Sequence, residues 1–168
     1  MGDEQRALRP VAVATKWLEN PRVWYDGGVD PAATGGQALS SLVMAGARVS
    51  VAEPGRVVCT LRVRAPLTDA AGRWHAGAVA AAVDNMCSAV AFTVEGAPTS
   101  TVSYGLSFFS PAGHDEVVVM EGRAVSRKGK LTAAVVEVRK EESGELVAIG
   151  RQWVTPAWPT KSNKSSKL

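Results

Sequence analysis

The sequence predicts an α+β fold in which six strands form a sheet wrapped around one long helix. Two strand-like segments precede a long, alanine-rich helical segment, and four more strand-like segments follow it. Short turn sequences separate the neighbouring strands, which favours antiparallel pairing. The helical segment is apolar nearly all round, so most of its surface must be covered. A sheet folded against this helix meets that requirement.

The strands are predicted from alternating apolar and polar residues between turn residues. The alternation is clearest from Val57 to Arg64, where one face is apolar and the other largely polar. Turns are expected at Glu53-Pro54-Gly55, Pro111-Ala112-Gly113, Arg127-Lys128-Gly129 and Ser143-Gly144. The predicted strands cover residues 43–51, 57–64, 101–108, 117–126, 131–140 and 146–154.

Residues 75–94 are predicted to form the long helix, because the run is too long and too rich in alanine for a strand, and Gly96 stands where a C-terminal cap belongs. A shorter amphipathic helix is expected around Pro10 to Leu18, with the proline near its first turn. Residues 24–37 are punctuated by glycine and proline and are expected to lack regular structure. The expected organisation is an N-terminal extension over residues 1–42, one compact domain over 43–155 and a flexible tail over 156–168.

Composition limits the classes of partner. The 168 residues carry a formal charge of +3, and the excess lies mainly in Lys161, Lys164 and Lys167. No basic stripe interleaved with aromatic residues occurs, which argues against nucleic-acid binding. Cys59 and Cys87 lie in apolar runs and are expected to be buried, reduced thiols. No metal site is predicted.

The ends of the chain bear on its location. The N-terminal residues contain no apolar signal core, and no segment is expected to approach the length of a membrane span, so we expect an intracellular protein. The C-terminal Ser166-Lys167-Leu168 matches the address read by the peroxisomal import receptor. Residues 161–165 before it are polar and basic, so the signal should be accessible. The expected location is the peroxisome, in an organism that has one, and the alternative is the cytosol.

Asp84 is the only charged residue between His75 and Thr93. A lone carboxylate in the middle of a buried helix is costly unless it is paired or hydrogen-bonded. Burial also raises the pKa of a carboxyl group, which suits a general base or a nucleophile. Alternatively, neighbouring backbone or hydroxyl groups at a subunit contact hold Asp84 in a purely structural role.

The start of the long helix is the second candidate feature. Free backbone N–H groups at a helix N-terminus suit a developing oxyanion, and the small residues Ala76 and Gly77 allow a carbonyl group to approach. His75 beside them is a candidate proton donor. It is equally a candidate for a capping or loop-bracing residue.

The spacing of Ala76 and Asp84 predicts an oligomer. Eight residues separate them, which is about 12 Å along a helix axis. A reacting carbon must lie roughly 3 Å from both the oxyanion donor and the attacking group. One helix cannot easily offer both groups to the same carbon. If both act, Asp84 comes from a second subunit whose helix runs antiparallel, and the site lies at a dimer interface.

Between residues 50 and 155 the chain resembles the hotdog-fold acyl-CoA thioesterases, and within them the acyl-CoA thioesterase 13 group. The order and spacing of several short motifs carry this resemblance together. They are Glu53-Pro54-Gly55, Thr68-Asp69-Ala70-Ala71-Gly72-Arg73-Trp74-His75-Ala76-Gly77, Val83-Asp84-Asn85, Gly96-Ala97-Pro98, Ser110-Pro111-Ala112 and Leu146-Val147-Ala148-Ile149-Gly150-Arg151.

The resemblance implies a curved six-stranded antiparallel sheet around the long helix, assembled into homodimers and often homotetramers. It implies that Asp84 activates water or attacks directly, and that the Ala76 N–H binds the thioester oxygen with His75 beside it. The family's loop asparagine falls on Asp69, and its supporting serine falls on Thr101. No cofactor is implied, because coenzyme A is part of the substrate.

Two of these positions depart from the family pattern. Asp69 replaces an amide that donates and accepts with a carboxylate that only accepts. If Asp69 and Asp84 share the site, the pKa of one of them should be high. Ala76 replaces the usual glycine, which keeps the N–H but narrows access, and Thr101 keeps a hydroxyl.

Coenzyme A carries phosphates, so basic residues should line the entrance. Arg127, Lys128 and Lys130 are candidates, although a solvated hairpin tip is the plainer interpretation. Arg73 and Arg151 are weaker candidates. Five aromatic residues suit an acyl pocket, although core packing is the plainer explanation for most of them; they are Trp24, Tyr25, Trp74, Phe108 and Phe109.

The expected activity is hydrolysis of acyl-CoA to a free acid and coenzyme A. One alternative is an acyl-CoA binding protein with weak catalysis, motivated by Asp69 and Ala76. The other is a hotdog enoyl-CoA hydratase, which needs an Asp and a His five residues apart in a loop containing proline. Asp69 and His75 are six apart with no proline between them.

Overall fold

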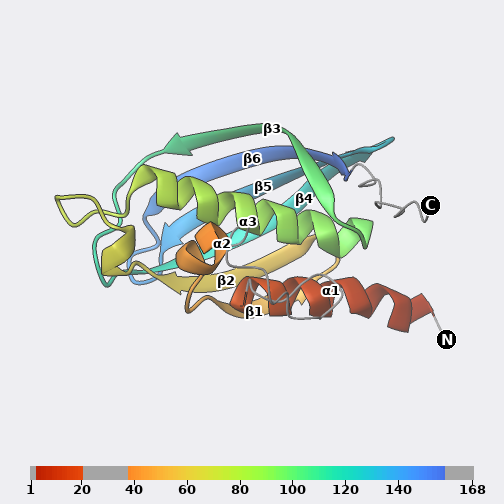
Figure 1. Ribbon diagram of the computed structural model, residues 1–168, viewed down its shortest axis with the longest axis horizontal. Helices are drawn as coiled ribbons and strands as arrows, with labels where there is room; N and C mark the ends of the chain where they lie inside the picture. Colours follow the sequence, from red (N-terminus) through yellow and green to blue (C-terminus); the bar gives the residue numbers. More distant parts are fainter. Residues whose placement is uncertain (1–2, 21–37, 158–168) are drawn as a thin grey trace, which may run out of the picture.

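The computed structural model describes residues 3–20 and 38–157 (Figure 1). The predicted irregular segment 24–37, with Trp24 and Tyr25, and the signal at residues 166–168 lie outside the described residues. The helices are α1 (Asp3–Glu19), α2 (Ala38–Val43) and α3 (Ala76–Glu95), with a 3₁₀ turn, η1 (Ala65–Leu67). The strands are β1 (Arg48–Glu53), β2 (Arg56–Arg62), β3 (Thr99–Phe108), β4 (Val117–Lys128), β5 (Leu131–Lys140) and β6 (Leu146–Pro156).

One six-stranded antiparallel sheet wraps around α3, as the sequence predicts (Figure 1). The strand order is β1-β2-β4-β5-β6-β3, so the strand that follows α3 crosses to the far edge of the sheet and pairs with β6. The other pairings are also antiparallel; β2 pairs with β4, and the remaining pairs join strands that are consecutive in the chain. The strand–strand–helix–four-strand order is therefore confirmed.

The core lies between α3 and the inner face of the sheet. Ala82, Val83, Met86 and Val90 of α3 are fully buried and belong to one apolar cluster with the inward residues of the strands. Gly96 ends the helix in the left-handed conformation with φ of 68°, and its N–H donates to the Phe92 carbonyl, as expected for a C-terminal cap.

Two glycines set how closely α3 approaches the sheet. A Cβ added at Gly150 of β6 would overlap the Val83 side chain, and one added at Gly122 of β4 would lie 2.6 Å from the Val90 Cγ2 atom. Any larger residue at either position would push α3 away from the sheet.

The first predicted strand starts too early. Residues 38–43 form α2, and β1 begins only at Arg48. Val43 and Met44 are fully buried at the end of this short helix, and a short apolar run of this kind fits a buried helical turn as well as a strand. Periodicity alone cannot separate the two.

The first helix begins at Asp3, seven residues before the predicted start, with Pro10 in its interior. A proline there removes one backbone hydrogen bond. Burial of Ala14, Trp17 and Leu18 against the rest of the fold offsets that loss. Tertiary packing, which the local sequence does not show, thus extends the helix.

The helix α1 packs along β1 and α3 and covers one margin of the sheet (Figure 1). The Glu19 Oε1 atom accepts a hydrogen bond of 2.9 Å from the backbone N–H of Val49 in β1. At the opposite margin, β3 pairs only with β6 among the described strands, and its bulge between Thr101 and Ser103 leaves Val102 58% exposed. The β1 edge is therefore partly shielded by α1, and the β3 edge has no such helix beside it among the described residues.

Two expectations concern apolar residues. Cys59 and Cys87 are buried free thiols, and burial raises the pKa of each to about 12. By length and composition, α3 is apolar enough to cross a membrane, contrary to the expectation that no segment would be. In the fold, 67% of its most apolar stretch is buried, because α3 is the central helix that the sheet covers.

Candidate active site

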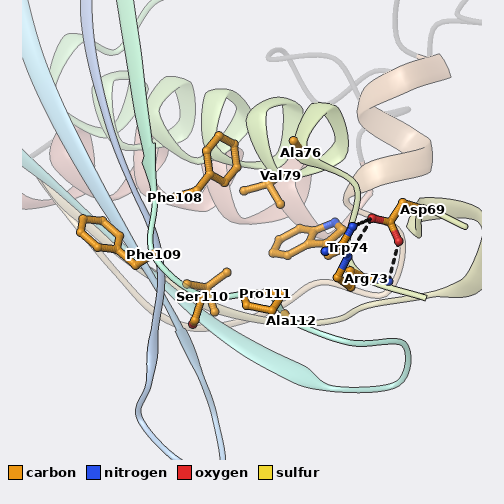
Figure 2. A pocket seen from close by; sticks show the side chains of 11 residues that line it. Asp69, Arg73, Trp74, Ala76, Val79, Phe108, Phe109, Ser110, Pro111 and Ala112 are labelled. Carbon is orange, nitrogen blue, oxygen red and sulfur yellow. Dashed lines mark hydrogen bonds and ion pairs between the residues drawn. The ribbon is translucent and has the colours of Figure 1, made fainter. Parts of the chain in front are cut away.

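A cavity of about 340 Å³ opens at the N-terminal end of α3. Figure 2 shows Trp74, Ala76 and Val79 on the side of α3, with the segment from Phe108 to Ala112 facing them. Phe108 and Phe109 are 52% and 59% exposed, so core packing is the wrong explanation for these two rings. They form open aromatic walls, whereas Trp74 is buried beneath the helix start.

The first turn of α3 leaves one backbone donor free. The Nδ1 atom of His75, the N-cap residue, accepts the Gly77 N–H at 3.0 Å, and the N–H groups of Ala78 and Val79 reach the His75 carbonyl. The Ala76 N–H has no hydrogen-bond partner among the described residues, and Ala76 lines the cavity. Because donors at a helix start carry the positive end of the helix dipole, this N–H is suited to an anionic oxygen.

His75 has the capping geometry that the sequence left as an alternative. Because its Nδ1 accepts a backbone hydrogen bond, the neutral ring carries its proton on Nε2. His75 is exposed and lies next to the cavity-lining Ala76. Its ring therefore fixes the helix start, and its Nε2–H remains available for a bound molecule.

Asp69 closes the loop that leads into α3. One carboxylate oxygen accepts the N–H groups of Ala71 and Arg73 at 2.9 and 3.0 Å, and the other pairs with the Arg73 guanidinium (Figure 2). These contacts lower the pKa of Asp69, chiefly through the backbone N–H of Arg73. The resemblance implies an asparagine at this position. The carboxylate of Asp69 is accommodated there because Arg73 supplies a positive partner.

Asp84 lies two turns farther along α3 and is half-buried against β6. One of its oxygens accepts a hydrogen bond from the Gln152 Nε2 atom. Burial raises the pKa of Asp84, and the Gln152 hydrogen bond partly opposes that rise. The same Nε2 atom donates to the Thr101 Oγ1 atom at 2.7 Å. The structure therefore joins Asp84 and Thr101 through one amide.

Gln152 is a further candidate residue, which the sequence alone does not predict. It is fully buried and shares the inner face of β6 with Gly150 and Val154, while Trp153 is 41% exposed on the outer face. A strand reading Gly150, Gln152, Val154 places an amide among inward positions, and that was the available signal. The adjacent tryptophan obscured it, because hydrophobicity alone favours burying the ring.

The chain does not bring all the predicted residues to one place. Asp84 does not line the cavity that contains Ala76, and it follows Ala76 by eight positions, which correspond to about 12 Å of helix. Asp69 lines this cavity and Asp84 does not, so the two carboxylates do not share it within one chain. Asp84 is the one whose pKa is raised.

The basic turn between β4 and β5 lies at the opposite end of α3 from the cavity. Arg127 pairs with Glu95, the last residue of the 20-residue α3, at 3.0 Å. That helix is about 30 Å long. Within one chain, Arg127, Lys128 and Lys130 are therefore remote from the cavity, whereas Arg73 stands on its wall. The described residues contain no cluster of three His, Cys, Asp or Glu side chains that would hold a metal ion.

Comparisons with known proteins agree on the family. The model of the thioesterase superfamily matches residues 71–147. Acyl-coenzyme A thioesterase 13 of Homo sapiens is 33% identical over 101 residues, which cover 60% of this chain and 72% of that protein. The protein of the same name from Mus musculus is 30% identical over an equal length.

Solved structures show the same fold. Zebrafish thioesterase superfamily member 2 is similar with a TM-score of 0.67 and 25% identity, over 72% of this chain and 92% of that one. A hypothetical thioesterase from Streptococcus pneumoniae, solved with coenzyme A, has a TM-score of 0.63 at 18% identity, over 66% and 85% of the two chains. The open-edged sheet, the covered central helix and the curated relatives converge on one assignment. The chain belongs to the acyl-CoA thioesterase family of the thioesterase superfamily, has its hotdog fold and is a thioester hydrolase.

Proposed function

We propose that this protein hydrolyses acyl-CoA at a site that two protomers build together. One protomer contributes the cavity and the Ala76 N–H, and the second contributes its Asp84. The observation that carries the proposal is the free N–H of Ala76 on the cavity wall, combined with a carboxyl group of raised pKa about 12 Å away along the same helix. If two α3 helices pair in antiparallel directions, Asp84 of the second protomer lies near Ala76 of the first.

The chemistry then follows from the two groups. The thioester oxygen accepts the Ala76 N–H, which stabilises the negative charge that develops on that oxygen. Asp84 of the partner subunit takes a proton from a water molecule as the water oxygen attacks the thioester carbon. Collapse of the tetrahedral intermediate breaks the carbon–sulfur bond. The leaving thiolate takes up the proton from Asp84, so that free acid and coenzyme A result and the carboxylate is restored.

The open edge of β3 supports the dimer. A strand with unpaired backbone groups and an exposed Val102 is a natural template for pairing with a second copy. Two copies of β3 related by a twofold axis would join the sheets and bring the central helices alongside each other in opposite directions. Dimer and tetramer both contain this pair, so the site requires only the dimer.

An antiparallel pair of α3 helices also brings the basic turn between β4 and β5 of one protomer close to the cavity of the other. The C-terminal end of one α3 then lies beside the N-terminal end of the other, where the cavity is. Lys128 and Lys130, exposed next to the Arg127–Glu95 pair, are the groups we assign to the phosphates of coenzyme A. The Streptococcus pneumoniae structure with coenzyme A supports this class of ligand.

A binding protein with weak catalysis is the second candidate, and the Asp69 geometry favours it. An asparagine in the loop would offer a second donor to the thioester oxygen, whereas the Asp69 carboxylate offers none and is engaged with Arg73. The hydratase gains no support, because it requires that carboxyl group to exchange protons and Arg73 lowers its pKa.

Replacing Ala76 by proline tests the proposed oxyanion donor. Ala76 is the first residue of α3, where proline is tolerated, and His75 before it has φ of −62° and ψ of 132°, which proline accepts in its predecessor. The substitution removes the N–H and puts the ring Cδ atom in the place of that hydrogen, so the thioester oxygen loses its donor. We expect turnover to fall by about a hundredfold or more, measured as thiol release from short, long and aromatic acyl-CoAs.

Ala76→Gly is the matched control, because it keeps the N–H and should keep turnover. Asp84→Asn should lower turnover by at least about a hundredfold with dimer and fold intact. Near-normal thiol release from either Ala76→Pro or Asp84→Asn would overturn the proposed mechanism. Wild-type protein that binds acyl-CoA without releasing thiol would establish the binding protein instead.

A further inference from the structure

Gln152 occupies a position that packing alone does not explain. It is fully buried on the inner face of β6, and its Oε1 atom has no hydrogen-bond partner among the described residues. A buried, unpaired acceptor costs free energy, and an apolar side chain of similar volume would avoid that cost. The contacts of the Nε2 end of the amide are therefore the reason to look for a role of Gln152 beyond packing.

That other end makes two hydrogen bonds to two different elements. The Nε2 atom donates to Asp84 on α3 and to the Oγ1 atom of Thr101 on β3. Both of its hydrogens are used, so the amide cannot reverse without placing an oxygen against a carboxylate. One side chain thereby fixes the helix carboxylate relative to the open edge strand.

The arrangement leaves two groups free at the same place. The second Asp84 oxygen has no hydrogen-bond partner among the described residues. Because Thr101 accepts from Gln152, its own hydroxyl hydrogen remains available to donate. A water molecule at this place could donate a hydrogen bond to Asp84 and accept one from Thr101.

We propose that Gln152 is a positioning residue that orients the Asp84 carboxylate and the Thr101 hydroxyl for activation of the attacking water. This inference rests on the proposed function, in which Asp84 is the base. Gln152 does not itself touch the reacting atoms. It acts through the two groups that it holds.

The surroundings of Asp84 give the inference an electrostatic readout. The titratable groups that face Asp84 are Cys87 of α3 and Tyr104 of β3, and burial raises the pKa of both, so both stay neutral near pH 7. From β6, the Gln152 side chain donates a hydrogen bond to Asp84, and this bond lowers the pKa of Asp84 because it favours the charged carboxylate. Loss of that donor should raise the pKa of Asp84 further.

Gln152→Met is the direct test, in the full-length dimer with the acyl-CoA that wild type turns over fastest among hexanoyl-, palmitoyl- and benzoyl-CoA. Methionine keeps the volume and removes the donor. We expect kcat to fall by about tenfold or more, while KM changes by less than about twofold, because substrate binding does not involve Gln152. The acid limb of the pH profile of kcat/KM should move to higher pH, since Asp84 must lose its proton to act.

Gln152→Glu is the second variant and keeps the shape of the side chain. A carboxyl group beside Asp84 competes with it for ionisation, so the acid limb should move up as well. In an Asp84→Asn background, Gln152→Met should cause no further loss, because the group that it positions is already absent.

Thr93→Val is the matched control. Thr93 is a buried polar residue of α3 that accepts the Gly55 N–H and has no contact with Asp84. Its loss should lower the melting temperature and leave the acid limb in place. A folded Gln152→Met or Gln152→Glu dimer with wild-type kcat and an unmoved acid limb would overturn the inference. If Asp84→Asn is inactive in the same assays, the proposed function stands and only the role of Gln152 fails; an active Asp84→Asn overturns the proposed function itself.

Discussion

Asp69 and Asp84 carry the same chemical group, yet their surroundings move their pKa values in opposite directions. Backbone N–H groups and Arg73 surround Asp69 and hold its pKa low. Apolar neighbours dominate at Asp84 and raise its pKa. At the scale of single residues, the environment therefore separates a carboxylate that braces a loop from one that can accept a proton.

Asp69→Asn should preserve or raise activity. The amide oxygen can still accept the N–H groups of Ala71 and Arg73, and its NH₂ group adds a donor near the cavity. Thiol release at saturating substrate measures the effect. Asp69→Ala is the control, because it loses every loop contact and should lower activity. A hundredfold loss in Asp69→Asn would instead place the Asp69 charge in the chemistry.

Asp84→Asn should stabilise the protein at pH 7 while it removes activity. Because burial raises the folded-state pKa of Asp84, the fold favours the protonated form. That contribution is fully present below the unfolded pKa of about 3.9 and is lost as pH rises through the folded pKa. A neutral asparagine avoids the loss. Thermal melts should show a higher melting temperature for Asp84→Asn at pH 7 and no difference near pH 3.5; an equal or lower value at pH 7 would contradict this.

At the scale of elements, the sequence determined the long ones well. The helix α3 with its Gly96 cap, and the strand β5 at residues 131–140, match their predicted bounds closely, because their periodic patterns are long and end at clear turn residues. The short apolar segment at Val43 and the extent of α1 were mispredicted, because both depend on packing against distant residues.

The residues of the candidate site also fall into two groups, those that the sequence predicts and one that only the fold shows. Asp84, Ala76 and Asp69 were accessible from the sequence, since each stands out by charge or motif in its own segment. Gln152 was not, because its role depends on the register that sets β6 beside β3 and α3. A residue that acts by joining three elements has no local signature.

Gly150→Ala should lower both stability and activity. An added methyl group would overlap Val83, the neighbour of Asp84 on α3, so the helix must shift at the site. We expect a loss of about 1–3 kcal/mol in the free energy of unfolding. Gly122→Ala is the matched control, since it meets Val90 six residues beyond Asp84. Denaturant titration and kcat should show similar destabilisation in both variants, with the larger loss of kcat in Gly150→Ala. Equal losses of kcat would argue against a local displacement of Asp84.

At the scale of the whole molecule, the proposed mechanism requires two chains to complete one site. Ala76 faces the cavity and Asp84 does not, although both belong to one helix. Because α1 packs along β1 and no described helix lies along the β3 edge, we expect a second chain to pair at β3.

Mixing two inactive variants should recover activity. In a heterodimer of Ala76→Pro and Asp84→Asn chains, one site combines the intact Ala76 of one chain with the intact Asp84 of the other. Random pairing of equal amounts makes half of the dimers mixed, each with one good site, so about a quarter of wild-type activity should return. Unfolding and refolding the two chains together, followed by a thiol-release assay, measures this. Activity no greater than the sum of the separate variants would show that each site lies within one chain.

The hydrogen bond from the Val49 N–H to Glu19 bears on how far the sheet can grow by adding further copies of the chain. Sheets with two bare margins can add copies indefinitely and grow into fibrils. Here α1 packs along β1 and Glu19 occupies one of its backbone donors, so in the proposed dimer we expect growth through the sheet to end once a second chain has docked on β3. We therefore expect a chain without residues 3–19 to form larger assemblies than the intact chain does, which size-exclusion chromatography would show.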